Sequence, residues 1–125
     1  MRQARVISAH RAPDRPSIRV AAGDAVMLGE RDSDWPQFVW ATLAQGLGGW
    51  IPAVLFDREI GQANALADYD TRELPTEIGE LITLHHQQEG WWWAENARGE
   101  SGWVPARAIV LMEDTPLMED KPDSP

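Results

Sequence analysis

The stretch Gly102-Trp103-Val104-Pro105-Ala106 occurs twice in this chain, and its second copy is Gly49-Trp50-Ile51-Pro52-Ala53. Glycine allows close approach of the backbone, and tryptophan brings a large flat surface. The β-branched residue is typical of an inward-facing strand position, and the proline ends the strand because it has no N–H for the ladder. Recurrence of such a motif within 125 residues indicates a duplicated structural unit.

The repeat extends backwards from the motif. Three further pairs of segments match, at spacings that grow from 53 to 59 residues towards the N-terminus: 40–41 with 93–94, 23–26 with 79–82, and 7–10 with 66–69. The extra residues of the first copy fall in polar, proline-containing stretches, where loops tolerate insertions. The chain is therefore expected to contain two equivalent halves.

Charge and composition narrow the classes of partner. The formal net charge is -9, with seven acidic and seven basic residues in 1–60 but eight acidic and three basic in 61–112. Such acidity argues against nucleic acids and anionic membranes, which attract clustered Lys and Arg, and favours basic partners or simple solubility. No apolar run approaches the ~20 residues of a membrane span and no signal peptide is evident, so we expect a cytoplasmic protein.

Strand patterns alternate with turn signals throughout both halves, and no segment has a helical period. The absence of cysteine excludes disulfides, and seven tryptophans supply apolar area to each small core. We expect an all-β fold of two small five-stranded barrels in tandem: domain 1 at 1–58, a linker at 59–62, domain 2 at 63–112 and a disordered acidic tail at 113–125. The expected core residues are Val26, Leu28, Ala41 and Ile51 in domain 1, and Leu66, Leu74, Ile82, Leu84, Ala94 and Val104 in domain 2.

The second half resembles the Src-homology-3 (SH3) domain. Ala65-Leu66-Ala67-Asp68-Tyr69 is similar to the opening Ala-Leu-Tyr-Asp-Tyr of that family, and Trp91-Trp92 to its paired tryptophans. The Gly102–Ala106 stretch is similar to its Gly-Tyr-Ile-Pro-Ser. The first half resembles the family in layout, and the pair resembles bacterial tandem variant members.

This resemblance implies a non-catalytic protein that binds extended, proline-rich peptides in an aromatic groove, because a polyproline II ligand loses little entropy on docking. The site residues that it implies in domain 2 are Tyr69, Asp70, Glu73, Glu77, Trp91, Trp103 and Pro105, with the carboxylates facing a ligand Arg. A secondary groove in domain 1 would use His10, Phe38, Trp50 and Pro52. Ala67 and Ala108 stand where the family has Tyr, so only weak binding of Pro/Arg-containing peptides is expected.

Two alternatives remain open from the residues. Strand alternation puts Trp91 and Trp93 on one face and Trp92 on the other, so aromatic surface serves either an external partner or an interface between packed barrels, as in a structural or assembly unit. The stretch from Pro13 to Pro16 is either a turn or a Pro-x-x-Pro ligand. His85-His86 point to opposite faces and do not indicate a metal site. No nucleophile, acid–base pair or cofactor motif indicates an enzyme.

Overall fold

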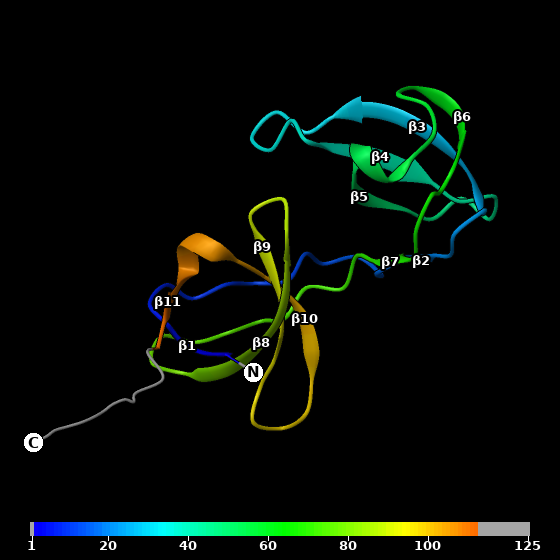
Figure 1. Ribbon diagram of the computed structural model, residues 1–125. Helices are drawn as coiled ribbons and strands as arrows, with labels where there is room; N and C mark the ends of the chain where they lie inside the picture. Colours follow the sequence, from blue (N-terminus) through cyan, green and yellow to red (C-terminus); the bar gives the residue numbers. More distant parts are fainter. Residues whose placement is uncertain (1, 113–125) are drawn as a thin grey trace, which may run out of the picture. The chain divides into compact units, whose positions relative to one another are not determined.

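A computed structural model describes residues 2–112 of the chain (Figure 1). These residues form short strands, turns and two single-turn 3₁₀ helices, which confirms the all-β prediction. Within this described range, no helix is long and apolar enough to cross a membrane. The tail predicted at 113–125 lies outside the described residues.

The chain divides into two compact units: unit 1 combines two separated stretches, and unit 2 is one stretch whose bounds differ from those expected. Among described residues, unit 1 contains 2–13 and 73–112, and unit 2 contains 14–72. The predicted boundaries at 1–58 and 63–112 instead followed the sequence order of the repeat. The difference arises from the pairing of the first strand of each half.

Unit 1 is built on one antiparallel five-stranded sheet with the order β10-β9-β8-β1-β11. Its elements are β1 (Arg2–Val6), β8 (Leu81–Gln88), β9 (Trp91–Glu95), β10 (Ser101–Pro105), the 3₁₀ turn η2 (Ala106–Ala108) and β11 (Ile109–Leu111). The strand β1 pairs with β8 on one side, where Ala4 faces Ile82, and with β11 on the other, where Val6 faces Ile109. The N-terminal strand of the chain therefore completes the sheet of its C-terminal half.

Unit 2 is built on a four-stranded antiparallel sheet with the order β5-β4-β3-β6 and a two-stranded ladder of β2 with β7. Its elements are β2 (Arg19–Val20), β3 (Ala25–Arg31), β4 (Phe38–Thr42), β5 (Gly48–Pro52), the 3₁₀ turn η1 (Ala53–Leu55), β6 (Gly61–Asn64) and β7 (Tyr69–Asp70). The strand β6 pairs with β3, so that Val26 faces Ala63, and a bridge joins Phe56 to Ala65. Unit 2 thus takes its first strand from the start of the second repeat.

Each half has exchanged its first strand with the other. The two exchanged strands have the same pattern, because Ala4 and Val6 are buried in unit 1 and Ala63 and Ala65 are buried in unit 2. The buried side chains of each exchanged strand are small or medium-sized, and they pack in the core next to larger aliphatic residues. In unit 1 those residues form one cluster: Leu74, Ile82, Leu84, Ala94, Val104, Ala108 and Ile109.

The core predictions are confirmed at nine of ten positions, and Leu66 is wrong. Leu66 is 60% exposed. Ile7, which occupies the matching position of the first repeat, is 49% exposed. The inward positions of this strand are Ala63 and Ala65, so alternation turns Leu66 outward. The prediction had placed the inward register one residue too late.

Unit 2 interrupts unit 1 in the loop between β1 and β8, and its two ends are held side by side. The Thr71 amide donates to the Ile18 carbonyl at 2.9 Å, and the Ile18 amide donates to the Thr71 hydroxyl at 2.8 Å. The β2–β7 ladder continues this pairing, as Figure 1 shows. Because insertions are tolerated where the inserted segment has adjacent ends, the exchanged connection costs little extra loop entropy.

We predict that residues 14–72 fold as an isolated fragment, whereas residues 61–125 do not. The first fragment keeps every strand of unit 2, but the second lacks β1, which lies between β8 and β11. Chemical denaturation followed by circular dichroism should show a cooperative transition for 14–72 and none for 61–125. A cooperative transition in 61–125 would mean that β6 can replace β1.

We also predict that Ile82→Ala destabilises the protein by roughly 2–5 kcal/mol, because it leaves a cavity in a packed core. Ile82 is 2% exposed and faces Ala4 across the exchanged strand pair. Urea denaturation measures this change, and Ile78→Ala is the matched control because Ile78 is 72% exposed. Equal stabilities of the two variants would contradict the assigned core.

Candidate functional site

An aromatic cluster lies where β9 begins and β10 ends in unit 1. Trp91 is the first residue of β9, and it faces Pro105, the last residue of β10, in the antiparallel register. The His10 ring packs on Trp91 edge to face, with ring centroids 5.5 Å apart and planes at 73°. Trp91 is half-buried and Pro105 is buried, so the partly open surface comes from Trp91 and His10.

A carboxylate completes this cluster. Glu73 Oε1 accepts a hydrogen bond from His10 Nε2 at 2.8 Å, and the two side chains are 21% and 15% exposed. His10 is fixed by reciprocal backbone bonds with Thr76, each 3.0 Å long. One anionic group and two rings therefore converge on one partly open patch, here called the unit 1 patch (His10, Glu73, Trp91 and Pro105).

The segment that carries Glu73 is held against β10. Glu73 forms a parallel bridge with Trp103, and the Leu74 amide donates to the Trp103 carbonyl at 3.0 Å. This close approach requires Gly102, because a Cβ there would lie 2.7 Å from the Leu74 amide nitrogen. The glycine of the repeated motif thus positions the acidic side of the patch.

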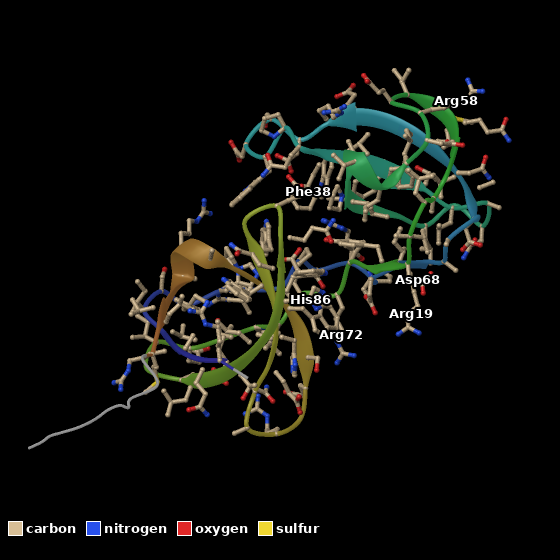
Figure 2. The ribbon with its side chains drawn as sticks, in the orientation of Figure 1. Arg19, Phe38, Arg58, Asp68, Arg72 and His86 are labelled. Atoms are coloured by element: carbon tan, nitrogen blue, oxygen red, sulfur yellow. The ribbon has the colours of Figure 1, made fainter. Side chains whose placement is uncertain are left out.

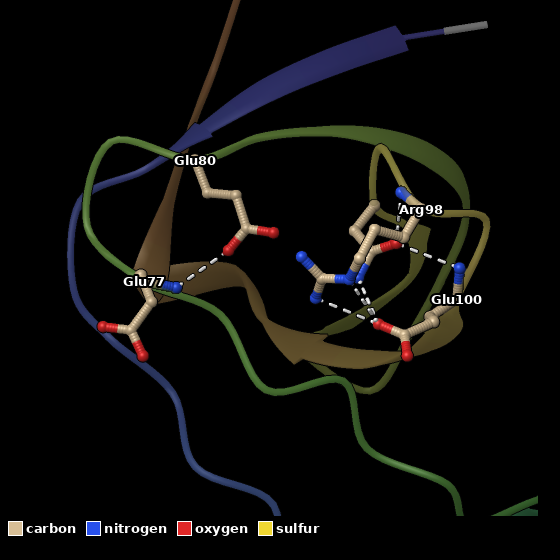
Figure 3. Close-up of polar contacts among 5 residues, drawn as sticks. Glu77, Glu80, Arg98 and Glu100 are labelled. Carbon is tan, nitrogen blue, oxygen red and sulfur yellow. Dashed lines mark hydrogen bonds and ion pairs between the residues drawn. The ribbon is translucent and has the colours of Figure 1, made fainter.

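Glu77, another acidic residue predicted for the site, lies in the turn before β8. Its amide donates to the Glu80 carboxylate at 2.9 Å, and its own side chain is exposed (Figure 3). Figure 3 also shows the tight turn between β9 and β10, where the Arg98 guanidinium contacts the Glu100 carboxylate at 3.0 Å. Both turns are stabilised by local polar contacts.

Tyr69 and Asp70 belong to unit 2, whereas the unit 1 patch is built from residues of unit 1. Both residues form β7 of unit 2, where Tyr69 faces Val20 and Asp70 pairs with Arg19 at 3.3 Å. His10, which the sequence assigned to the first groove, lies in unit 1 instead. His10 and Tyr69 occupy matching positions of the repeat. The strand exchange therefore places His10 in unit 1 and Tyr69 in unit 2.

The other predicted residues of the secondary groove lie together in unit 2. Phe38 faces Pro52 across β4 and β5, and Trp35 packs edge to face on Phe38 with centroids 6.5 Å apart. Phe38 and Pro52 are both buried, whereas Trp50 is half-buried. Of these three predicted residues, Trp50 is therefore the one with accessible aromatic surface.

Sequence reasoning missed a second aromatic feature that both units share. Trp40 and Trp50 pack edge to face with centroids 5.0 Å apart at 75°, and Trp93 and Trp103 do so at 5.2 Å and 74°. Each pair is cross-strand in register. The alternation that places Trp93 on the face of Trp91 was not a sufficient signal, because the partner lies on the next strand and depends on the register between the strands.

The unit 1 patch combines groups suited to binding rather than to bond making. A carboxylate beside a tryptophan ring attracts a cationic side chain, and the ring with a nearby proline offers a flat apolar surface. Among residues 2–112, no three His, Cys, Asp or Glu side chains gather as metal ligands would.

Comparison with known proteins finds similarity to a known family in part of the chain. Residues 64–106 match the family model of the SH3 domain. The chain is 28% identical over 68 residues to myosin-1 of Malassezia globosa, which covers 52% of this chain and 5% of that protein. It is 37% identical over 51 residues to myosin heavy chain IB of Acanthamoeba castellanii, which covers 38% of this chain and 4% of that protein. The chain thus spans about one twentieth of the length of these curated relatives, and no solved structure matches.

The matched segment crosses from one unit to the other. It begins with the last residue of β6 in unit 2 and ends just after β10 in unit 1. SH3 domains are non-catalytic interaction modules, so the match supports a role in protein binding. The matched segment is continuous in the sequence. In the fold, however, the first strand of unit 1 is β1, which comes from residues 2–6.

We predict that Gly102→Ala destabilises the protein by about 1–3 kcal/mol, because its Cβ would meet the backbone at Leu74 and not a flexible side chain. Gly29→Ala is the matched control, since its Cβ would lie no closer than 3.8 Å to another atom. Thermal unfolding compares the two variants. If Gly102→Ala is as stable as Gly29→Ala, the close approach between Gly102 and Leu74 does not exist.

Proposed function

We propose that the protein is a non-catalytic, adaptor-like interaction protein of two SH3-like barrels, and that unit 1 binds extended peptides that carry prolines and an arginine. The observation that carries the proposal is the unit 1 patch, where Glu73 is 2.8 Å from His10 and His10 packs on Trp91. The SH3 match over residues 64–106 supports the same class of function.

The parts of the patch suit different parts of such a peptide. The Trp91 ring, which lies opposite the buried Pro105 across β9 and β10, offers the surface on which a ligand proline packs. Glu73 supplies the negative charge for the ligand arginine, whose guanidinium forms strong charge-assisted hydrogen bonds with carboxylates. Glu73 is part-buried, which limits screening of this pairing by salt.

The expected affinity is low. His10 occupies the place that the sequence had given to Tyr69, and Ala108 is a buried alanine where the family has an aromatic residue. Fewer flat rings mean fewer surfaces for the ligand prolines. We expect micromolar or poorer dissociation constants, which correspond to about -8 kcal/mol or weaker.

The test is a titration of the full chain with a synthetic peptide that carries two prolines and one arginine, followed by calorimetry. Trp91→Ala should weaken binding about tenfold or more, since it removes a central aromatic anchor. Glu73→Gln should weaken it several-fold and reduce its dependence on salt. Glu59→Gln is the control for charge, because Glu59 is an exposed residue of unit 2.

The proposal fails if the wild-type chain does not bind the peptide at millimolar concentration. It also fails if Trp91→Ala and Glu59→Gln bind the peptide equally well, because the patch would then have no part in recognition. That result would favour the alternative in which the aromatic surface serves assembly.

A further inference from the structure

The Trp40–Trp50 pair of unit 2 forms a preorganised aromatic surface. Trp40 lies across the start of β5, where a Cβ at Gly48 would be only 2.6 Å from Trp40 Cζ2. Glycine at this position therefore lets the indole approach the backbone closely. Trp40 and Trp50 are both half-buried, so each keeps part of its ring surface open.

A cation of the same chain covers this surface. The Arg15 guanidinium carbon lies 5.3 Å from the centroid of the Trp40 ring, within the range of a cation–π contact. Among the described residues, no carboxylate lies within ion-pair distance of Arg15. Arg15 is exposed and stands next to Pro16, in the Pro-x-x-Pro stretch that the sequence left open as turn or ligand.

The corresponding pair in unit 1 is also covered, but by a different group. His86 stacks on Trp93 with centroids 6.4 Å apart at 13°, and it meets Trp103 edge to face at 5.4 Å. His86 belongs to the neighbouring strand β8, whereas Arg15 comes from an arm that leads to β2. The repeated pair is thus a surface that accepts a planar nitrogen-containing group, and in unit 2 that group is on a loop.

We propose that the Trp40–Trp50 pair is a guanidinium-binding subsite that the chain's own Arg15 occupies, so that an arginine-containing peptide segment binds there only by displacing Arg15. The ligand class is arginine in an extended peptide, because Arg15 itself represents the bound state. The proposal concerns unit 2 and does not depend on the peptide site of unit 1.

The contact between Arg15 and Trp40 within the same chain determines how strongly Arg15 competes with a peptide arginine. A tethered group acts at an effective concentration in the millimolar range for a short flexible connection. A single cation–π contact is weak, so a free arginine side chain at lower concentration does not compete. Removal of the Arg15 side chain should therefore open the subsite without a change in the Trp pair itself.

The experiment follows the seven tryptophan indole N–H signals of the full chain by nitrogen–proton NMR. Arg15→Gln keeps a polar side chain but removes the guanidinium, and Arg15→Ala is the second variant. Arg58→Gln is the matched control, because Arg58 projects from the turn before β6, as Figure 2 shows, and it is also exposed. The added probe is N-acetylarginine amide, with N-acetylglutamine amide as the neutral comparison.

We expect Arg15→Gln to shift the indole signals of Trp40 and Trp50 while the signals of unit 1 stay in place. N-acetylarginine amide should then move both signals back towards their wild-type positions, at concentrations at least about fivefold below those that affect wild type or Arg58→Gln. N-acetylglutamine amide should have no effect.

The proposal is overturned if Trp40 and Trp50 do not respond to loss of Arg15, or if the probe acts equally on Arg15→Gln and wild type. Trp40→Leu in the Arg15→Gln background should abolish the response, and a response that persists would place the probe elsewhere. Because the readout concerns unit 2 signals, failure here is distinct from failure of peptide binding at Trp91.

Discussion

The pairing of β1 with β8 and β11 is the interaction on which the rest of the structure depends. It buries Ala4 and Val6 in the core of unit 1, and without it Ile82 and Ile109 would lie at unpaired sheet edges. It also fixes the path of the chain, because the loop between β1 and β8 must contain all of unit 2. The ladder between β2 and β7 makes this insertion possible by holding the ends of unit 2 together.

The strand exchange determines which residues meet in the candidate sites. An arm that follows β1 brings His10 to Glu73 and Trp91, and the matching arm after β6 brings Tyr69 to Val20. The unit 1 patch is therefore assembled from both halves of the sequence. A change in the arm after β1 is therefore expected to disturb the surroundings of Trp91, although the two are far apart in the chain.

The repeated motif allowed most of the fold to be predicted, because its residues act locally. The proline ends a strand, the β-branched residue is buried, and the small turn after it appears in both halves as η1 and η2. The sequence could not show which of the two units each first strand joins. Residues 4–6 and 63–65 have equivalent inward positions, so their pattern does not tell which core each strand serves, and only the tertiary pairing distinguishes them.

The candidate sites were predictable to the same extent. Alternation correctly separated Trp92, which packs against the core, from Trp91 and Trp93. The register of β9 with β10 then explains why Trp91 meets Pro105. The contact of Arg15 with Trp40 was not accessible in this way, because it depends on the path of a loop and on the absence of a side chain at Gly48. Loops are positioned by tertiary packing, which a periodic pattern does not encode.

The most direct test of the strand exchange is the set of cross-strand nuclear Overhauser effects to β8 in the full chain. The strand exchange predicts contacts from residues 2–5 to residues 81–84, with Gln3 opposite Thr83 and Arg5 opposite Leu81. It equally predicts contacts from β6 to β3, with Ala63 opposite Val26. Contacts from residues 61–64 to β8 in place of those from β1 would contradict the exchange and restore two consecutive units.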